Sequence, residues 1–220
     1  MKKVWVNLSV VVLALGIIAV AYYVWHVNQQ GGALRQLPIF NPIAAELQNN
    51  IAPNDNHKVK DFKVVNQYGD TITRKDFSGK ITVVDFFFTT CQGICPKMTN
   101  QMDRVMVKYR KDDRVLLLSH TVNPENDSVP VLRGYAEKHI KEKGKWHFVT
   151  GDKAHLYDLA RTSYLLSDTR GDGGKEDFVH SNNFALVDHN GYIRGMYDGT
   201  DPKDVDRLLA EMDVLLAELK

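Results

Sequence analysis

The sequence predicts an α/β fold in which helices cover a mixed β-sheet, and it places this domain behind one N-terminal transmembrane helix. Three observations lead to this prediction. Apolar, strand-like runs alternate with amphipathic helical stretches from residue 58 to the C-terminus. An Asn-Gly dipeptide between the last two strand-like runs is a strong hairpin signal. The first 25 residues contain a long apolar segment without charge.

Composition narrows the class of protein. The chain has 220 residues, of which 44% are hydrophobic and 25% charged, which suits one globular domain of moderate size. Lys and Arg number 28 against 27 Asp and Glu. The protein therefore lacks the net positive charge that attracts a phosphate backbone, and no nucleic acid partner is expected. The two cysteines, Cys91 and Cys95, lie too close together to build a disulfide framework.

The apolar N-terminal segment, Val4 to Trp25, decides the expected compartment. Its roughly 22 residues would cover about 33 Å as a helix, which is enough to cross a bilayer. Lys2 and Lys3 precede it, so we expect the N-terminus in the cytoplasm and the remaining chain outside it. Residues 1–25 are therefore predicted to anchor the protein in the cytoplasmic (inner) membrane, with the soluble domain facing the periplasm. A signal peptide cleaved after the A-x-A pattern at residues 19–21 is the alternative.

Residues 26–57 are rich in Pro, Gly and amides and lack sustained periodicity, which predicts a linker. The domain is then expected over residues 58–220. It should begin with a hairpin, because residues 58–65 and 71–73 flank the turn Gln67-Tyr68-Gly69-Asp70. The run ITVVDFFF at residues 81–88 is apolar enough for a strand in the middle of a sheet.

The remaining helices and strands are predicted from the spacing of apolar residues, which is three to four residues in a helix and two in a strand. Residues 96–110 place apolar side chains at three- and four-residue spacings, as in an amphipathic helix whose first turn tolerates Pro96. The predicted order after it is strand 114–119, helix 129–143, strand 146–150, helix 153–162, strands 184–187 and 192–197, and helix 202–219.

The chemistry is concentrated in the run Cys91-Gln92-Gly93-Ile94-Cys95-Pro96, where a strand is followed by a helix. A thiol near a helix N-terminus faces unpaired N–H groups, which favour the thiolate that attacks disulfides and binds soft metals. Export would place this thiol pair in an oxidising compartment. Gln92 and Gly93 favour an exposed loop over two cysteines buried as small apolar residues.

Cu(I) is often bound by two thiolates and an imidazole, so a histidine is the expected third ligand. Two of the eight histidines are candidates: His180, in a loop before the strand 184–187, and His120, which ends the strand 114–119. The others are expected at the solvated surface: His26, His57, His139, His147, His155 and His189.

Three further features of the sequence bear on the site. Met98 is a soft donor close to Cys95, but its place in the helical stripe favours core packing. Asp85 interrupts an apolar strand, so it is either a buried carboxylate that tunes the thiols or a residue that reaches solvent. Residues 170–177, RGDGGKED, predict a solvated loop, although such a loop could also carry His180 toward or away from the sulfurs.

Four segments together resemble the Sco/SenC family, which comprises membrane-anchored thioredoxin-like proteins implicated in copper delivery to cytochrome c oxidase. They are FTTCQGICPKM at 88–98, TVNPENDSVPVL at 121–132, WHFVTG at 146–151 and FVHSNNFALVDHNGYI at 178–193. The resemblance runs from about residue 58 to the C-terminus. It implies a thioredoxin-like domain with Cys91, Cys95 and His180 as copper ligands.

The chain departs from the family pattern at two positions. Gln92 replaces the usual proline after the first cysteine, and Asn123 replaces the first aspartate of the D-P-x-x-D stretch. The cysteines and the histidine are intact, so the metal site is still expected.

Two functions follow from the residues and the resemblance. The first is a copper chaperone, which binds Cu(I) and passes it to the CuA subunit of cytochrome c oxidase or another cuproprotein client. Binding of Cu(II) as well is an open alternative. The second is a thiol-disulfide oxidoreductase acting on exported proteins, in which Cys91 attacks a partner disulfide, Cys95 resolves it, and a thiol reductant restores the pair. A peroxidase is a weaker third alternative. We expect a metallochaperone rather than an enzyme, and His180 distinguishes the two main functions because only metal binding requires it.

Overall fold

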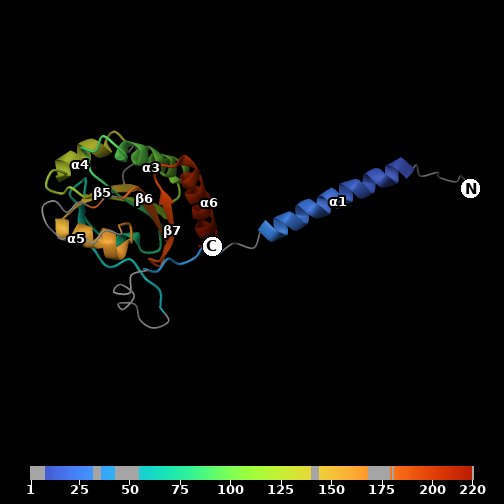
Figure 1. The fold of residues 1–220 in the computed structure, drawn as a ribbon, viewed down its shortest axis with the longest axis horizontal. Coiled ribbons are helices and arrows are strands. Elements are labelled where there is room, and N and C mark those ends of the chain that lie inside the picture. Colours follow the sequence, from blue (N-terminus) through green and yellow to red (C-terminus); the bar gives the residue numbers. More distant parts are fainter. Residues whose placement is uncertain are drawn as a thin grey trace, which may run out of the picture. The chain divides into compact units, whose positions relative to one another are not determined.

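The structure, a computed structural model, describes residues 8–31, 36–42, 55–139, 144–167, 179 and 181–219 (Figure 1). The chain divides into two compact units, Met1–Gln36 and Leu37–Lys220. The first unit contains helix α1 (Leu8–Gly31). Taken over the residues that the structure describes, no helix combines the length and the apolarity that a membrane crossing requires. The transmembrane helix over residues 1–25 therefore stays a prediction.

The described part of the second unit is built on a seven-stranded mixed sheet in the order β2-β1-β5-β4-β3-β6-β7. The three central strands, β5, β4 and β3, run parallel, and the strands on both sides of them pair antiparallel. The strand bounds are β1 (Lys63–Asn66), β2 (Thr71–Thr73), β3 (Ile81–Phe87), β4 (Val115–Thr121), β5 (Trp146–Thr150), β6 (Asn183–Val187) and β7 (Ile193–Asp198). The mixed sheet predicted from the sequence is confirmed.

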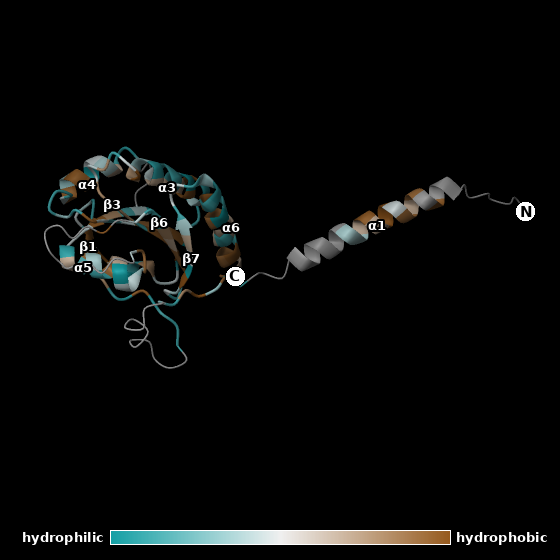
Figure 2. Cartoon of the chain, viewed as in Figure 1, coloured by the Kyte–Doolittle hydropathy of each residue, from teal (hydrophilic) through white to brown (hydrophobic). Residues whose placement is uncertain are grey.

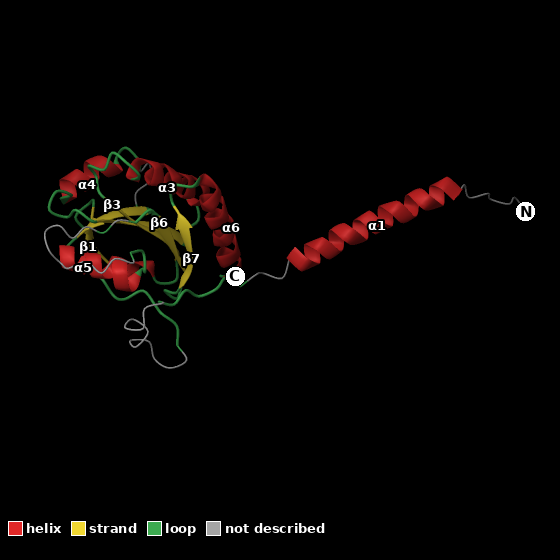
Figure 3. Cartoon of the chain, in the orientation of Figure 1, coloured by secondary structure: helices red, strands yellow, loops and turns green. Residues whose placement is uncertain are grey.

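Helices cover both faces of the sheet (Figures 1 and 3). One face carries α3 (Cys95–Tyr109), α4 (Val129–Ala136) and α6 (Pro202–Glu218). The other face carries α5 (Lys153–Asp158) and the π-helical turn η2 (Leu159–Ser163), and a 3-10 turn, η1 (Arg74–Phe77), follows β2. Figure 2 shows teal, hydrophilic residues on the outer surfaces of these helices. The expected α/β sandwich is therefore present, with a turn at residues 74–77 that the sequence did not predict.

Alternating side chains on β3 divide the interior into two clusters. Ile81, Val83 and Phe87 pack with α3 and α6 in the cluster that we call the α3 core. Val84 and Phe86 point the other way, into the cluster beneath α5 that we call the α5 core. A strand buried on both faces explains why residues 81–88 read as a continuous apolar run.

The apolar stripe of α3 lies in the α3 core as the periodicity predicts. Met98 and Met102 are 1% and 0% exposed, so both side chains pack against the sheet. Each such burial contributes about 1.5 to 3 kcal/mol relative to an exposed side chain. The core interpretation of Met98 is confirmed.

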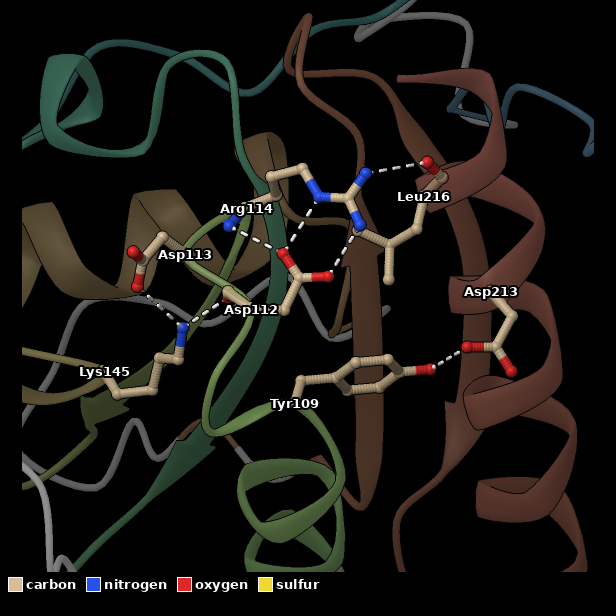
Figure 4. Close-up of polar contacts among 7 residues, drawn as sticks. All are labelled: Tyr109, Asp112, Asp113, Arg114, Lys145, Asp213 and Leu216. Carbon is tan, nitrogen blue, oxygen red and sulfur yellow. Dashed lines mark hydrogen bonds and ion pairs between the residues drawn. The ribbon is translucent and has the colours of Figure 1, made fainter. Parts of the chain in front are cut away.

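Polar contacts join α3 to α6 at the edge of the sheet where β3 and β4 begin (Figure 4). The hydroxyl of Tyr109, the last residue of α3, donates to Asp213 Oδ1 at 2.9 Å. Arg114 holds the carboxylate of Asp112 through Nε at 2.9 Å and Nη2 at 2.7 Å, and it donates to the carbonyl oxygen of Leu216 at 3.2 Å. These bonds stabilise the end of the sheet where β3 begins, and the cysteines follow its other end.

Part of the segment expected as a linker, residues 26–57, packs on the domain. Leu37 is buried in the α3 core, and its carbonyl oxygen accepts a hydrogen bond of 2.7 Å from Arg194 Nη2. His57 is also buried, with Nε2 lying 2.8 Å from the carbonyl oxygen of Ser163. The expectation that His57 is a solvated surface residue is therefore wrong, because the chain before β1 crosses the surface beside η2.

Candidate dithiol site

The two cysteines lie at the carboxyl end of β3, where the sequence places them. β3 ends at Phe87, Cys91 follows in a partly exposed loop, and Cys95 is the buried first residue of α3. Both side chains are free thiols. Pro96 occupies the first turn of α3, where a missing N–H breaks no helical hydrogen bond.

The two thiols differ in their affinity for a proton. Partial burial opposes ionisation of Cys91, but the Cys95 thiol and the N–H groups of Gly93, Ile94 and Cys95 outweigh it and lower the pKa of Cys91. Burial raises the pKa of Cys95 to about 12, and the hydrogen bond and charge of Cys91 and the charge of Asp85 add to this effect. Cys91 is therefore the reactive outer thiol, and Cys95 is the inner thiol that keeps its proton.

Asp85 is 2% exposed, so the interpretation in which it reaches solvent is wrong. It lies on β3 in register with Ser119 of β4, whose hydroxyl donates to its carboxylate. Trp146 Nε1 donates in turn to Ser119 Oγ at 2.8 Å. Burial raises the pKa of Asp85 to about 7, although the Ser119 hydrogen bond works in the opposite direction. The carboxylate is thus buried and its charge acts on Cys95.

His120 lies on the opposite face of the sheet from the α3 core, against which the cysteines pack. Its ring stacks on Phe86 with centroids 4.9 Å apart, inside the aromatic part of the α5 core. Within the described part of the chain, neither ring nitrogen has a hydrogen-bond partner. Burial lowers the pKa of His120 to about 3, and the charge of His155 adds to this shift. His120 is therefore a neutral core histidine.

His180 lies outside the described residues, but the chain on both sides of it is described. β6 runs antiparallel to β3, with Val84 opposite Ala185, so β6 begins at Asn183 beside the carboxyl end of β3. Val179 is 2% exposed in the α5 core. Topology therefore brings the start of β6 to the edge of the sheet that carries the cysteines. Among the described residues, no three His, Cys, Asp or Glu side chains form a group that could hold a metal ion.

Sequence reasoning missed Asp127, a fully buried carboxylate near the cysteine loop. It accepts hydrogen bonds from the hydroxyls of Thr89 and Thr121, both at 2.5 Å. Its position as the last residue of the D-P-x-x-D stretch is the signal that could have revealed it.

A mixed sheet with a dithiol between a central strand and the following helix defines a thioredoxin-like domain. A family model described as SCO1/SenC matches residues 51–216, and the chain belongs to this family. The SCO1 protein homolog of Bacillus subtilis is 27% identical over 159 residues, covering 71% of this chain and 82% of the relative.

Two solved structures extend this comparison. BsSco, described as a member of the Sco family of cytochrome c oxidase assembly proteins with a disulfide switch, is 27% identical with a TM-score of 0.61. The match covers 75% of this chain and 96% of BsSco. ScoI of Arabidopsis thaliana with copper bound shares the fold, with 23% identity, a TM-score of 0.58, and coverage of 73% of this chain and 98% of ScoI. The thioredoxin-like Sco fold is confirmed.

Proposed function

We propose that this protein is a copper chaperone that binds Cu(I) through Cys91, Cys95 and His180 and delivers it to the CuA site of cytochrome c oxidase or to another cuproprotein. The observation that carries the proposal is the pair of free thiols at the start of α3, since thiolates are the preferred ligands of Cu(I). Copper in a solved family member and the oxidase-assembly role named for BsSco support it.

The two thiols suit capture and release of a soft cation. Cys91 is partly exposed and has a lowered pKa, so it offers the first thiolate to an incoming ion. Cys95 gives up its proton only when the metal replaces it, so binding should release a proton and weaken at low pH. A client's thiolates can then replace the protein's ligands one at a time, beginning at the exposed side of Cys91, and take the ion by ligand exchange.

The proposal is tested by a Cu(I) titration of the full-length protein in detergent against a competing chelator. We expect the reduced protein to bind one Cu(I) and the protein with a Cys91–Cys95 disulfide to bind none, because a disulfide offers no thiolate. Reduction of the same oxidised sample should restore binding and serves as the control. Unchanged affinity after oxidation would rule out the dithiolate site.

A second function, thiol-disulfide oxidoreductase, is favoured by the difference between the thiols. In this reaction the Cys91 thiolate attacks a client disulfide and forms a mixed disulfide, which releases one client thiolate. Cys95 then attacks Cys91, which releases the second client thiol and leaves a Cys91–Cys95 disulfide. An external thiol reductant must return the pair to the reduced state. A partly exposed thiol with a lowered pKa beside a buried one fits this sequence of steps.

We also propose that residues 1–25 anchor the protein in the cytoplasmic membrane with the domain on the periplasmic side. Support comes from the uncharged segment Val4 to Trp25 behind Lys2 and Lys3. A reporter that is active only in the cytoplasm should therefore be inactive when fused to the C-terminus. The same reporter fused before Met1 should be active. Activity of the C-terminal fusion would refute both the orientation and the compartment.

A further inference from the structure

The hydrogen-bonded ladder between β3 and β4 stops just before the cysteine loop. Phe87 pairs with Thr121 at the ends of the two strands. The N–H of Val122 then donates to the Phe87 carbonyl oxygen at 2.8 Å. Residues 88–94 continue from there to α3 without strand pairing. The β3–β4 ladder therefore does not itself hold the loop that carries Cys91.

The carboxylate of Asp127 supplies an attachment for this loop. Asp127 is 0% exposed and accepts from both the N–H of Thr89, at 3.2 Å, and the hydroxyl of Thr89, at 2.5 Å. It also accepts from the hydroxyl of Thr121 at the end of β4, at 2.5 Å. Losing a buried acceptor leaves its donors unsatisfied. One carboxylate thus ties the loop after β3 to the end of β4.

The residue held by Asp127 is adjacent to a backbone segment that contacts both cysteines, Cys95 through its thiol and Cys91 through its N–H. Thr89 follows Phe88, whose backbone hydrogen-bonds the Cys95 thiol. The carbonyl oxygen of Phe88 accepts from the N–H of Cys91 at 3.2 Å. A shift of Thr89 would therefore move the Phe88 backbone away from both cysteines.

We propose that Asp127 is a positioning residue that holds Cys91 and Cys95 at the separation that both disulfide formation and metal binding require. The proposal concerns the site of the proposed function, but its geometric claim does not depend on copper. Holding two groups in place raises their effective concentration toward each other. Without the Asp127 contact, the loop should spend less time in the arrangement that brings the thiols together.

The test compares Asp127→Asn with the parent by two measurements on the full-length protein. The first is the equilibrium constant for forming the Cys91–Cys95 disulfide in a dithiothreitol redox buffer without metal, and the second is Cu(I) affinity. We expect both constants to fall, and the Cu(I) affinity to fall by about tenfold, because outer contacts of a metal site typically contribute 10- to 100-fold. Asp152→Asn is the matched control, because Asp152 accepts from the N–H of His155 at the start of α5 and should leave both constants unchanged.

Thr89 provides a second, milder pair of variants. Thr89→Val removes one donor to Asp127 and should lower both constants. Thr89→Ser keeps the hydroxyl and should leave both constants at the parent values. If Asp127→Asn does not fold, this pair decides the question, and parent-like constants for Thr89→Val overturn the proposal. A lower melting temperature with unchanged constants for folded Asp127→Asn would also overturn it. A parent that binds no copper, with a disulfide constant that still falls in Asp127→Asn, would refute copper delivery and support the positioning role.

Discussion

His180→Ala is expected to lower the Cu(I) affinity of the reduced protein by more than about 100-fold, because the loss of a ligand exceeds the loss of an outer contact. The disulfide equilibrium of Cys91 and Cys95 should change by less than about tenfold. That equilibrium depends mainly on local groups, namely the N–H groups of residues 93–95 that stabilise the Cys91 thiolate. Chelator competition and redox-buffer titration of the same samples measure the two quantities.

The matched control is His189→Ala. His189 follows β6 at the end opposite His180, and its ring lies 2.9 Å from Asn190 Nδ2 at the exposed turn. His120 is unsuitable, because its side chain is fully buried among aromatic rings and its removal would leave a cavity. If neither His180→Ala nor His189→Ala changes copper binding, and cells keep normal oxidase activity with His180→Ala, the oxidoreductase function replaces copper delivery.

Asp85→Asn is expected to remove a large pH-dependent loss of stability that the parent protein shows. Burial raises the pKa of Asp85 from 3.8 to about 7, so the folded protein holds a proton that the unfolded chain has released. The stability that this proton contributes is complete below pH 3.8 and is lost as pH rises through 7. The parent should therefore lose about 4 kcal/mol through this group between pH 4 and pH 8. The asparagine variant does not ionise and should not show this loss.

The measurement is the free energy of unfolding of both proteins in urea at pH 4 and pH 8. His120 works in the opposite direction: burial lowers its pKa to about 3, so its contribution is present above pH 6.5 and is lost as pH falls. Because His120 is present in both proteins, its effect cancels in the difference between them. Asp152→Asn serves as the surface control. Equal pH dependence in the parent and Asp85→Asn would contradict the assignment of a buried, proton-binding carboxylate.

Local periodicity was sufficient to predict the framework of the domain. β3, α3 and the last hairpin lie within one or two residues of the predicted ranges, because each carries a clear apolar pattern or a turn signal. The helix expected over 129–143 ends at Ala136 and is followed by a turn at residues 137–139, so the predicted range is too long, and residues 140–143 lie outside the described part. The strand predicted to end at Ser119 continues to Thr121, since it pairs with β3 along its whole length.

Contacts between distant segments could not be predicted in this way. Ser119 and His120 are neighbours on β4, yet one bonds to Asp85 in the α3 core and the other stacks on Phe86 in the α5 core. Only the parallel register of β3 and β4 assigns these partners. Asp127 was missed for the same reason, because its donors come from two other segments. The cysteines were found from local sequence, whereas His180 was singled out by the family resemblance.

X-ray absorption spectroscopy of the reduced, full-length protein loaded with one equivalent of Cu(I) tests the proposed ligand set. Coordination by Cys91, Cys95 and His180 predicts two sulfur ligands and one imidazole nitrogen around the ion, and His180→Ala should lose the nitrogen while keeping both sulfurs. A parent spectrum with sulfur ligands alone, or an imidazole signal that persists in His180→Ala, would contradict the proposed site.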